Sequence, residues 1–148
     1  MSVTVDRREW MATLAKAPVE VLEDAWNRLD VRPTYRVLRS PETGLVMVRA
    51  RAGSTGMQFH VGEVAVTRCT VQVEGGAAGT AYILGRNPRH AERAALFDAL
   101  LQDSRWHAFL MKTLIQPIAA SVQERKNKIA RKVAATKVEF FTMVRGED

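Results

Sequence analysis

Apolar side chains near the start of the chain recur at the spacing of α-helices. Within residues 6–16, Trp10 and Leu14 are one helical turn apart, which predicts a first amphipathic helix. Pro18 can begin a second helix, because proline is well tolerated in the first helical turn. The apolar positions of this second helix are Val21, Leu22, Ala25, Trp26 and Leu29.

After Pro33 the pattern changes to the alternation of β-strands. Apolar residues within 35–38 and 45–48 flank the turn-forming segment 40–44, and this arrangement predicts a β-hairpin. The glycine-containing segment 53–56 marks a second break and offers a weak resemblance to a phosphate-binding loop, for which a plain turn is the alternative.

A β-rich run follows from residue 58 to residue 73. Its apolar parity shifts between 64–66 and 69–73, which fits either a bulge or a strand buried on both faces. The pair Gly75-Gly76 predicts the next turn, and residues 80–84 predict a fourth strand.

The chain then becomes helical. Asn87 followed by Pro88 fits an N-cap and a first helical position. Apolar residues between Ala91 and Leu101 surround almost the whole helix, which predicts that it is buried against the sheet.

Two more helices and a last strand complete the pattern. The helices are predicted over 104–116 and 118–136, separated at Pro117, and the segment 138–144 is β-like. We therefore predict one α+β domain spanning residues 1–148. It has an antiparallel-rich sheet of about five strands packed against helices, an N-terminal helical pair, and a long C-terminal helix followed by a final strand.

Composition places the chain among ordinary globular proteins. Of its 148 residues 47% are hydrophobic and 26% are charged, which excludes a disordered chain, a collagen-like chain and a disulfide scaffold. The formal charge is +6, with a sequence pI of about 10.0. This charge fits an anionic partner, whether nucleic acid, a phosphorylated small molecule or an acidic protein surface, and equally fits simple solubility.

Several kinds of chemistry find no support in the residues. The lone Cys69 makes neither an internal disulfide nor an iron–sulfur ligand set, and His60, His90 and His107 show no metal-binding spacing. Neither a GxxxxGK[ST] nor a GxGxxG motif is present. The first residues lack an apolar run and no apolar stretch approaches membrane-spanning length, so we expect a cytoplasmic protein.

The most pronounced polar cluster lies at 85–93, where a predicted strand enters a helix. Free amides at a helix N-terminus favour an anion, and Arg86, Arg89 and His90 add positive charge. The alternative is structural: Arg86 and Arg89 would be solvated, and Glu92, Arg93 and Asp98 would form ion pairs on a buried helix.

Two segments near the C-terminus are candidate interaction surfaces. Residues 125–137 hold six basic side chains and no acid, which fits a nucleic-acid backbone, a partner-docking helix or a solvated face. The apolar segment 138–144 would be aggregation-prone if exposed, so it must pair within its own sheet or with another chain. Its candidate interface residues are Phe140, Phe141, Met143 and Arg145.

Taken together, these segments resemble the PhnG subunits of the bacterial carbon–phosphorus lyase system. The resemblance extends over nearly the whole chain, and its most specific part is the combination of the ending with the His90 cluster. It is carried by Trp10-Met11, Leu14-Ala15, 42–46, Arg51, 53–56, Gly62-Glu63, Thr67-Arg68, Gly85-Arg86, 90–93, 98–100 and 140–146.

This resemblance implies a place in a core complex of four different subunits, with two copies of each. There the family partners a nucleosidase-like subunit, and together they replace the adenine of ATP by an alkylphosphonate. ATP, S-adenosylmethionine and the iron–sulfur cluster then belong to the complex, and this chain alone would bind no cofactor and no metal. No catalytic residue is assigned by the resemblance. Arg68, Arg86, His90 and Glu92 are the candidates for contact with a phosphate-rich ligand or a partner.

Three functional hypotheses follow. The first is a required accessory subunit that supports the nucleosidase-like partner in forming α-D-ribose 1-methylphosphonate 5-triphosphate from ATP and methylphosphonate, without activity of its own. The second is a small basic nucleic-acid-binding protein that uses residues 125–137. The third is a free-standing enzyme acting at Arg86 and His90, although no nucleophile or base is evident there.

Overall fold

The computed structural model describes the backbone of residues 3–51 and 58–146, and the side chains of residues 7–49 and 62–136. The elements in chain order are α1 (Val3–Lys16), α2 (Val19–Asn27), β1 (Tyr35–Arg51), β2 (Gln58–Val73), β3 (Ala78–Leu84), α3 (Pro88–Leu101), α4 (Ser104–Leu110), a π-helical turn (Met111–Ile115) and α5 (Gln116–Gly146). The predicted α+β class is confirmed. None of the described helices is long and apolar enough to cross a membrane.

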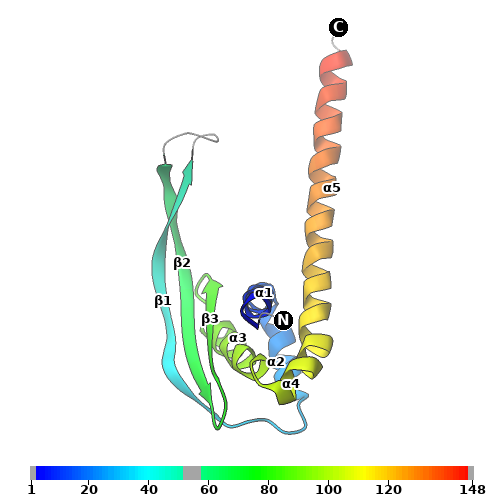
Figure 1. Ribbon diagram of the computed structural model, residues 1–148. Coiled ribbons are helices and arrows are strands. Elements are labelled where there is room, and N and C mark those ends of the chain that lie inside the picture. The colour runs from blue at the N-terminus through cyan, green and yellow to red at the C-terminus, as the bar shows by residue number, and fades with distance from the viewer. Residues whose placement is uncertain (1–2, 52–57, 147–148) are drawn as a thin grey trace.

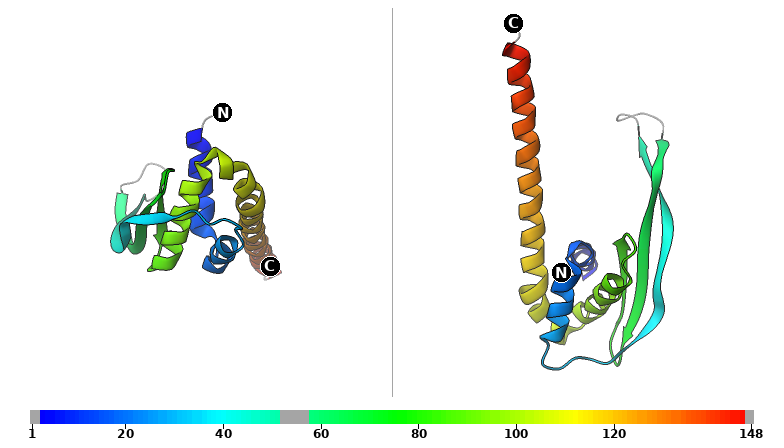
Figure 2. Two further views of the ribbon diagram at one scale, coloured as in Figure 1. Left: turned by 90° about the horizontal axis from the view of Figure 1, so that it is seen from below. Right: turned by 180° about the vertical axis from the view of Figure 1, so that it is seen from behind.

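The molecule has a small body from which two arms rise on the same side (Figure 1). The body stacks α3 on one face of the antiparallel sheet β1-β2-β3, α1 and α2 cover α3, and the start of α5 packs against α1. One arm is the far part of the β1–β2 ribbon, and the other is the far part of α5 (Figure 2). The core therefore occupies only the base of the molecule.

Helix α3 is buried on nearly all sides, as its sequence predicts. Its buried positions include four alanines, Phe97 and three leucines, and even its Asp98 is fully covered. Asn87 and Pro88 stand at the predicted N-cap and first helical positions, although the Asn87 side chain bonds back to the carbonyl of Leu84 instead of capping the helix. The predicted N-terminal helical pair is also present as α1 and α2.

The hairpin predicted over 35–48 is wrong, because β1 runs through the turn-like segment without reversing. The register against β2 shifts between Val37 and Arg39 and again between Arg39 and Glu42. Such bulges absorb residues that cannot join the ladder, and Pro41 is tolerated there because β1 is an edge strand. The predicted break at 53–56 lies outside the described residues.

The parity shift predicted along β2 is caused neither by a bulge in the half of the strand that α3 covers nor by burial of the strand on both faces. Cys69, Val71 and Val73 face α3 and are buried, whereas Val64 is 37% exposed on the opposite face. The pairing of β2 with β3 is regular throughout. The two faces of β2 therefore carry their apolar residues in different halves of the strand.

The final strand predicted over 138–144 is also wrong, because α5 continues as a helix to Gly146. No glycine or proline interrupts residues 118–145, and extending an existing helix costs far less than starting a new element. With the expected hairpin merged into β1 and this segment helical, the sheet has three strands where about five were predicted.

Pro117 does not end the helical region either. The π-helical turn Met111–Ile115 precedes it, and α5 begins at Gln116, so the proline stands in the first turn of α5. Proline cannot donate the hydrogen bond of a helix interior, and the π-helical turn directly before it changes the bonding pattern at the place where that donor is missing. The predicted break between two helices is therefore a change of helix type.

Candidate functional site

The corner where β3 enters α3 is organised by the buried side chain of Thr67. Its hydroxyl donates to the carbonyl of Gly85 at 2.6 Å, accepts from the backbone N–H of Asn87 at 3.1 Å, and lies 2.9 Å from the Thr43 hydroxyl. Gly85 has a φ of +88°, a conformation that side-chain-bearing residues rarely adopt. The corner is therefore held by internal hydrogen bonds that join β1, β2 and the start of α3.

Two of the predicted contact residues on α3 serve the fold. The Nε2 of His90 lies 2.9 Å from the carbonyl oxygen of Leu14, and since a carbonyl only accepts, Nε2 carries the proton. Glu92 accepts a hydrogen bond of 3.0 Å from the Tyr35 hydroxyl. These contacts tie α3 to α1 and to the start of β1.

The structural interpretation of the charged residues on α3 is confirmed for Arg93 and Asp98. Arg93 pairs with Glu23 at 3.1 Å, donates to the Tyr35 hydroxyl at 3.1 Å and stacks on the Trp26 ring at 5.3 Å. These contacts join α2, α3 and β1. For Glu92 the partner is a hydroxyl and not a cation.

The other two predicted contact residues, Arg68 and Arg86, reach the surface. Arg68 lies on the face of the sheet opposite α3, where it pairs with Glu42 at 3.3 Å while 49% exposed. Arg86 is exposed and makes no hydrogen bond or ion pair within the described part of the chain. No contact joins any two of Arg68, Arg86, His90 and Glu92 among the described side chains. Their role toward a phosphate-rich ligand or a partner stays a prediction.

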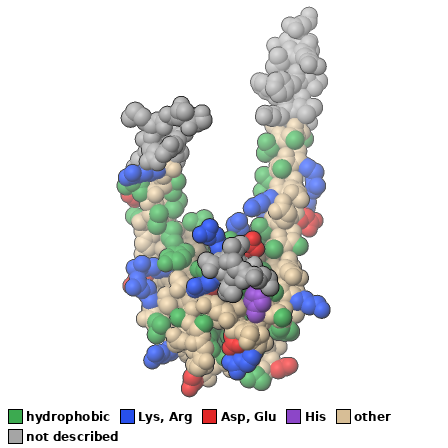
Figure 3. All heavy atoms as spheres, in the orientation of Figure 1, with side chains coloured by type: hydrophobic (Ala, Val, Ile, Leu, Met, Phe, Trp, Pro, Cys, Tyr) green, Lys and Arg blue, Asp and Glu red, His purple; other side chains and the backbone are tan. Residues whose placement is uncertain are grey.

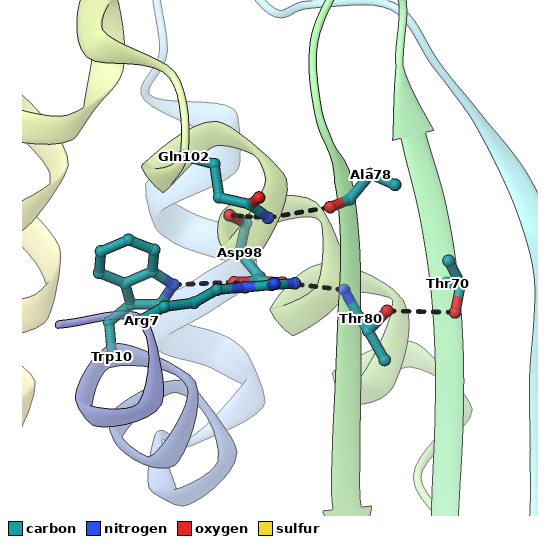
Figure 4. Close-up of polar contacts among 7 residues, drawn as sticks. All are labelled: Arg7, Trp10, Thr70, Ala78, Thr80, Asp98 and Gln102. Atoms are coloured by element: carbon teal, nitrogen blue, oxygen red, sulfur yellow. Dashed lines mark hydrogen bonds and ion pairs between the residues drawn. The ribbon is translucent and has the colours of Figure 1, made fainter. Parts of the chain in front are cut away.

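Asp98 is the most buried charged group among the described residues, and Figure 4 shows the contacts of its carboxylate. Its carboxylate accepts hydrogen bonds from Arg7 at 3.2 and 2.9 Å, from the Trp10 indole at 2.8 Å and from the Thr80 backbone N–H at 2.9 Å. The hydrogen bonds between Arg7 and Asp98 raise the pKa of Arg7, since the bonded carboxylate favours the charged guanidinium. With both oxygens occupied, Asp98 is a structural hub linking α1, α3 and β3.

Cys69 is fully buried under α3, and burial together with the nearby Glu92 charge raises its pKa to about 11. We expect the folded chain at pH 8 to react with a thiol reagent at least about a hundredfold more slowly than the unfolded chain, because so little thiolate is present and it is covered. The free energy of unfolding should also fall as the pH rises from about 9 to about 11, since the unfolded thiol ionises first. Thiol labelling and alkaline denaturation of the wild type beside Cys69→Ala measure both effects, and rapid labelling of the folded chain would contradict them.

The β arm exposes apolar residues on both of its faces. Leu45 is 70% exposed, Met47 and Val46 are each 49% exposed, and Val48 and Val64 are also exposed. A two-stranded ribbon is only marginally stable by itself, and apolar side chains on both faces need cover. The sequence does contain this signal, as the unbroken apolar run 45–48.

The α5 arm shows the same feature. Beyond Val122 every described residue of α5 is exposed, including Ile129 at 57% and Val133 at 59%. The space-filling view shows the two arms standing apart with hydrophobic and basic side chains on their surfaces (Figure 3). The side chains of Phe140, Phe141, Met143 and Arg145 lie outside the described residues, so their predicted interface role is not addressed by the structure.

Comparison with known proteins matches nearly the whole chain. The family model described as "Phosphonate metabolism protein PhnG" matches residues 5–146. A relative from Rhizobium meliloti (strain 1021), named alpha-D-ribose 1-methylphosphonate 5-triphosphate synthase subunit PhnG, is 43% identical over 142 residues. This alignment covers 96% of the chain and 90% of the relative.

Proposed function

The chain belongs to the PhnG family of phosphonate metabolism proteins, and from this premise we propose that it is an accessory subunit of a synthase that makes α-D-ribose 1-methylphosphonate 5-triphosphate. The observation that carries the proposal is the 43% identity to a named subunit of that synthase across 96% of the chain. The two arms support a subunit role, since their exposed apolar side chains need a covering surface.

Within that synthase, the chain positions a nucleosidase-like subunit and performs no chemistry itself. The buried acid Asp98 is saturated with donors, and the only cysteine is a covered thiol with a raised pKa. His90 is held by the Leu14 carbonyl. The proposal therefore places ATP, S-adenosylmethionine and the iron–sulfur cluster on other subunits, with two copies of this chain in each complex.

Reconstitution tests this proposal. The synthase subunits of the same organism, mixed with ATP and methylphosphonate, are expected to release adenine and form the triphosphate product, followed by ³¹P NMR. Omitting this chain should lower the rate at least about tenfold, because the partner loses its supporting surface, and adding the purified chain back should restore it. Full activity without the chain, or turnover by the chain alone, would overturn the accessory role.

The nucleic-acid alternative is less well supported by the described side chains. Ile129 and Val133 stand within the basic stretch of α5 and would face phosphates without an apolar partner. No aromatic side chain suitable for stacking with bases occurs in residues 116–136.

A further inference from the structure

One face of α5 is buried in the body at the start of the helix and is exposed where the helix extends beyond the body. Ile118 is 6% exposed, and Val122 packs against the edge of the core. At about 100° per residue, Ile129 and Val133 return to the same side of the helix. The apolar stripe that holds α5 on the body therefore continues for about three more turns along the inner side of the arm.

Basic side chains line both edges of this stripe. Arg125 and Lys132 lie along one edge, and Lys126 lies along the other. The single acid of the described arm, Glu124, falls on the opposite side of the helix, where Arg131 also lies. An apolar seam flanked by basic side chains complements a helix whose apolar seam is flanked by acidic side chains.

At the base of the arm the same pattern forms a hollow of about 230 Å³ between α5 and the α1–α2 junction. Val21, Ile118 and Val122 supply apolar walls, and Lys16 and Arg125 supply charge. Lys126 lies so close to Lys16 that it lowers the pKa of Lys16. No carboxylate pairs with Lys16, Arg125 or Lys126 among the described ion pairs, so an anionic group placed here would relieve their repulsion.

The β arm provides a second apolar wall. Thr43, Leu45 and Met47 share one face of β1, because side chains alternate along a strand and the register is regular there. Thr43 reaches the buried Thr67, so this is the face that α3 covers lower down. Above α3 the face is bare and looks toward the α5 arm across the hollow centre of the molecule (Figures 1 and 3).

We propose that the inner face of α5, from the Lys16 hollow to Val133, is the docking site for an acidic amphipathic helix of another subunit, with the β arm closing the opposite side. The proposal rests on the proposed subunit role and adds the surface and the chemistry of the partner. A second copy of this chain is disfavoured on the same face, because the same basic side chains would meet each other.

Co-expression of the full chain with the synthase subunits of its organism tests the site through a matched pair of variants. Ile129→Asp places a charge in the apolar seam, and Asn127→Asp adds the same charge on the far side of the helix. Both positions are exposed, so both variants should keep the wild-type circular dichroism and melting temperature. The partner recovered with Ile129→Asp should fall at least about tenfold, while recovery with Asn127→Asp should equal that of the wild type.

A photo-reactive amino acid at position 133 identifies the contacting segment. Cross-links to an acidic helical segment of a synthase subunit support the proposal. Cross-links to a second copy of this chain or to nucleic acid, or undiminished recovery with Ile129→Asp, overturn the docking site and leave the subunit role intact. If the wild-type chain recovers no synthase subunit, the subunit role and the docking site both fail.

Discussion

Replacing Asp98 by alanine is expected to destabilise the folded chain by about 3–5 kcal/mol. The substitution removes the shared acceptor of Arg7, the Trp10 indole and the Thr80 backbone N–H. Those donors lie in or beside the core, where water replaces the lost bonds poorly. Because a domain of this kind has only about 5–15 kcal/mol of stability, the loss should be visible as a large drop in the midpoint of urea unfolding.

Asp103→Ala is the matched control for this prediction. Asp103 caps α4 and pairs with the exposed Arg105, so its removal should lower the midpoint of urea unfolding much less than Asp98→Ala does. Arg7→Ala should cost less than Asp98→Ala, since Arg7 is 37% exposed and water can reach the vacated side. An Asp98→Ala variant as stable as the Asp103→Ala variant would show that the buried network contributes little.

The hub shows why sequence reasoning identified only half of this network. Asp98 could be assigned to a structural ion pair because an acid on a buried helix needs a partner. That partner, Arg7, lies 91 residues away, and nothing local distinguishes it from the neighbouring Arg8. His90 posed the same difficulty, since it bonds to the backbone carbonyl of Leu14, and every residue has a carbonyl.

Helices were predicted well where their signals are local. Apolar spacing located α1 and α2, and the pair Asn87-Pro88 located the start of α3. Two of the errors arose where a longer-range effect prevailed. In β1 the continuous partner β2 carries the chain past Pro41, and in α5 the uninterrupted helix overrides the β propensity of the segment 138–144.

The arms were recognised only in part for a related reason. Apolar runs indicate burial, and the sequence alone does not say whether the cover comes from the same chain. The basic stretch 125–137 fits a docking helix, a nucleic-acid surface or a solvated face, and its sequence favours the solvated face. A docking role is favoured only by the observation that the apolar seam of α5 stays exposed where the helix extends beyond the body.

Replacing Gly79 by alanine is expected to destabilise the fold by about 3 kcal/mol or more. Gly79 lies on β3 directly beneath α3, and a Cβ there would collide with the carbonyl oxygen of Ala95 and come within 2.5 Å of the backbone nitrogen of Ala99. Both atoms belong to the helix backbone, so no side-chain rotation relieves the collision. The buried alanines on this face of α3 let the helix backbone lie very close to β3, and only glycine on β3 leaves room for it.

Gly44→Ala provides the control within the same sheet. A Cβ at Gly44 meets nothing within 4 Å, so this substitution should change the free energy of unfolding by less than about 1 kcal/mol. Urea unfolding of the two variants beside the wild type measures the contrast. Since α3 holds Asp98 beside Thr80, a helix displaced by Gly79→Ala should also weaken that hub, and Gly79→Ala combined with Asp98→Ala should cost less than the two separate losses added together. Equal stability of the Gly79→Ala and Gly44→Ala variants would show that α3 can withdraw from the sheet at little cost.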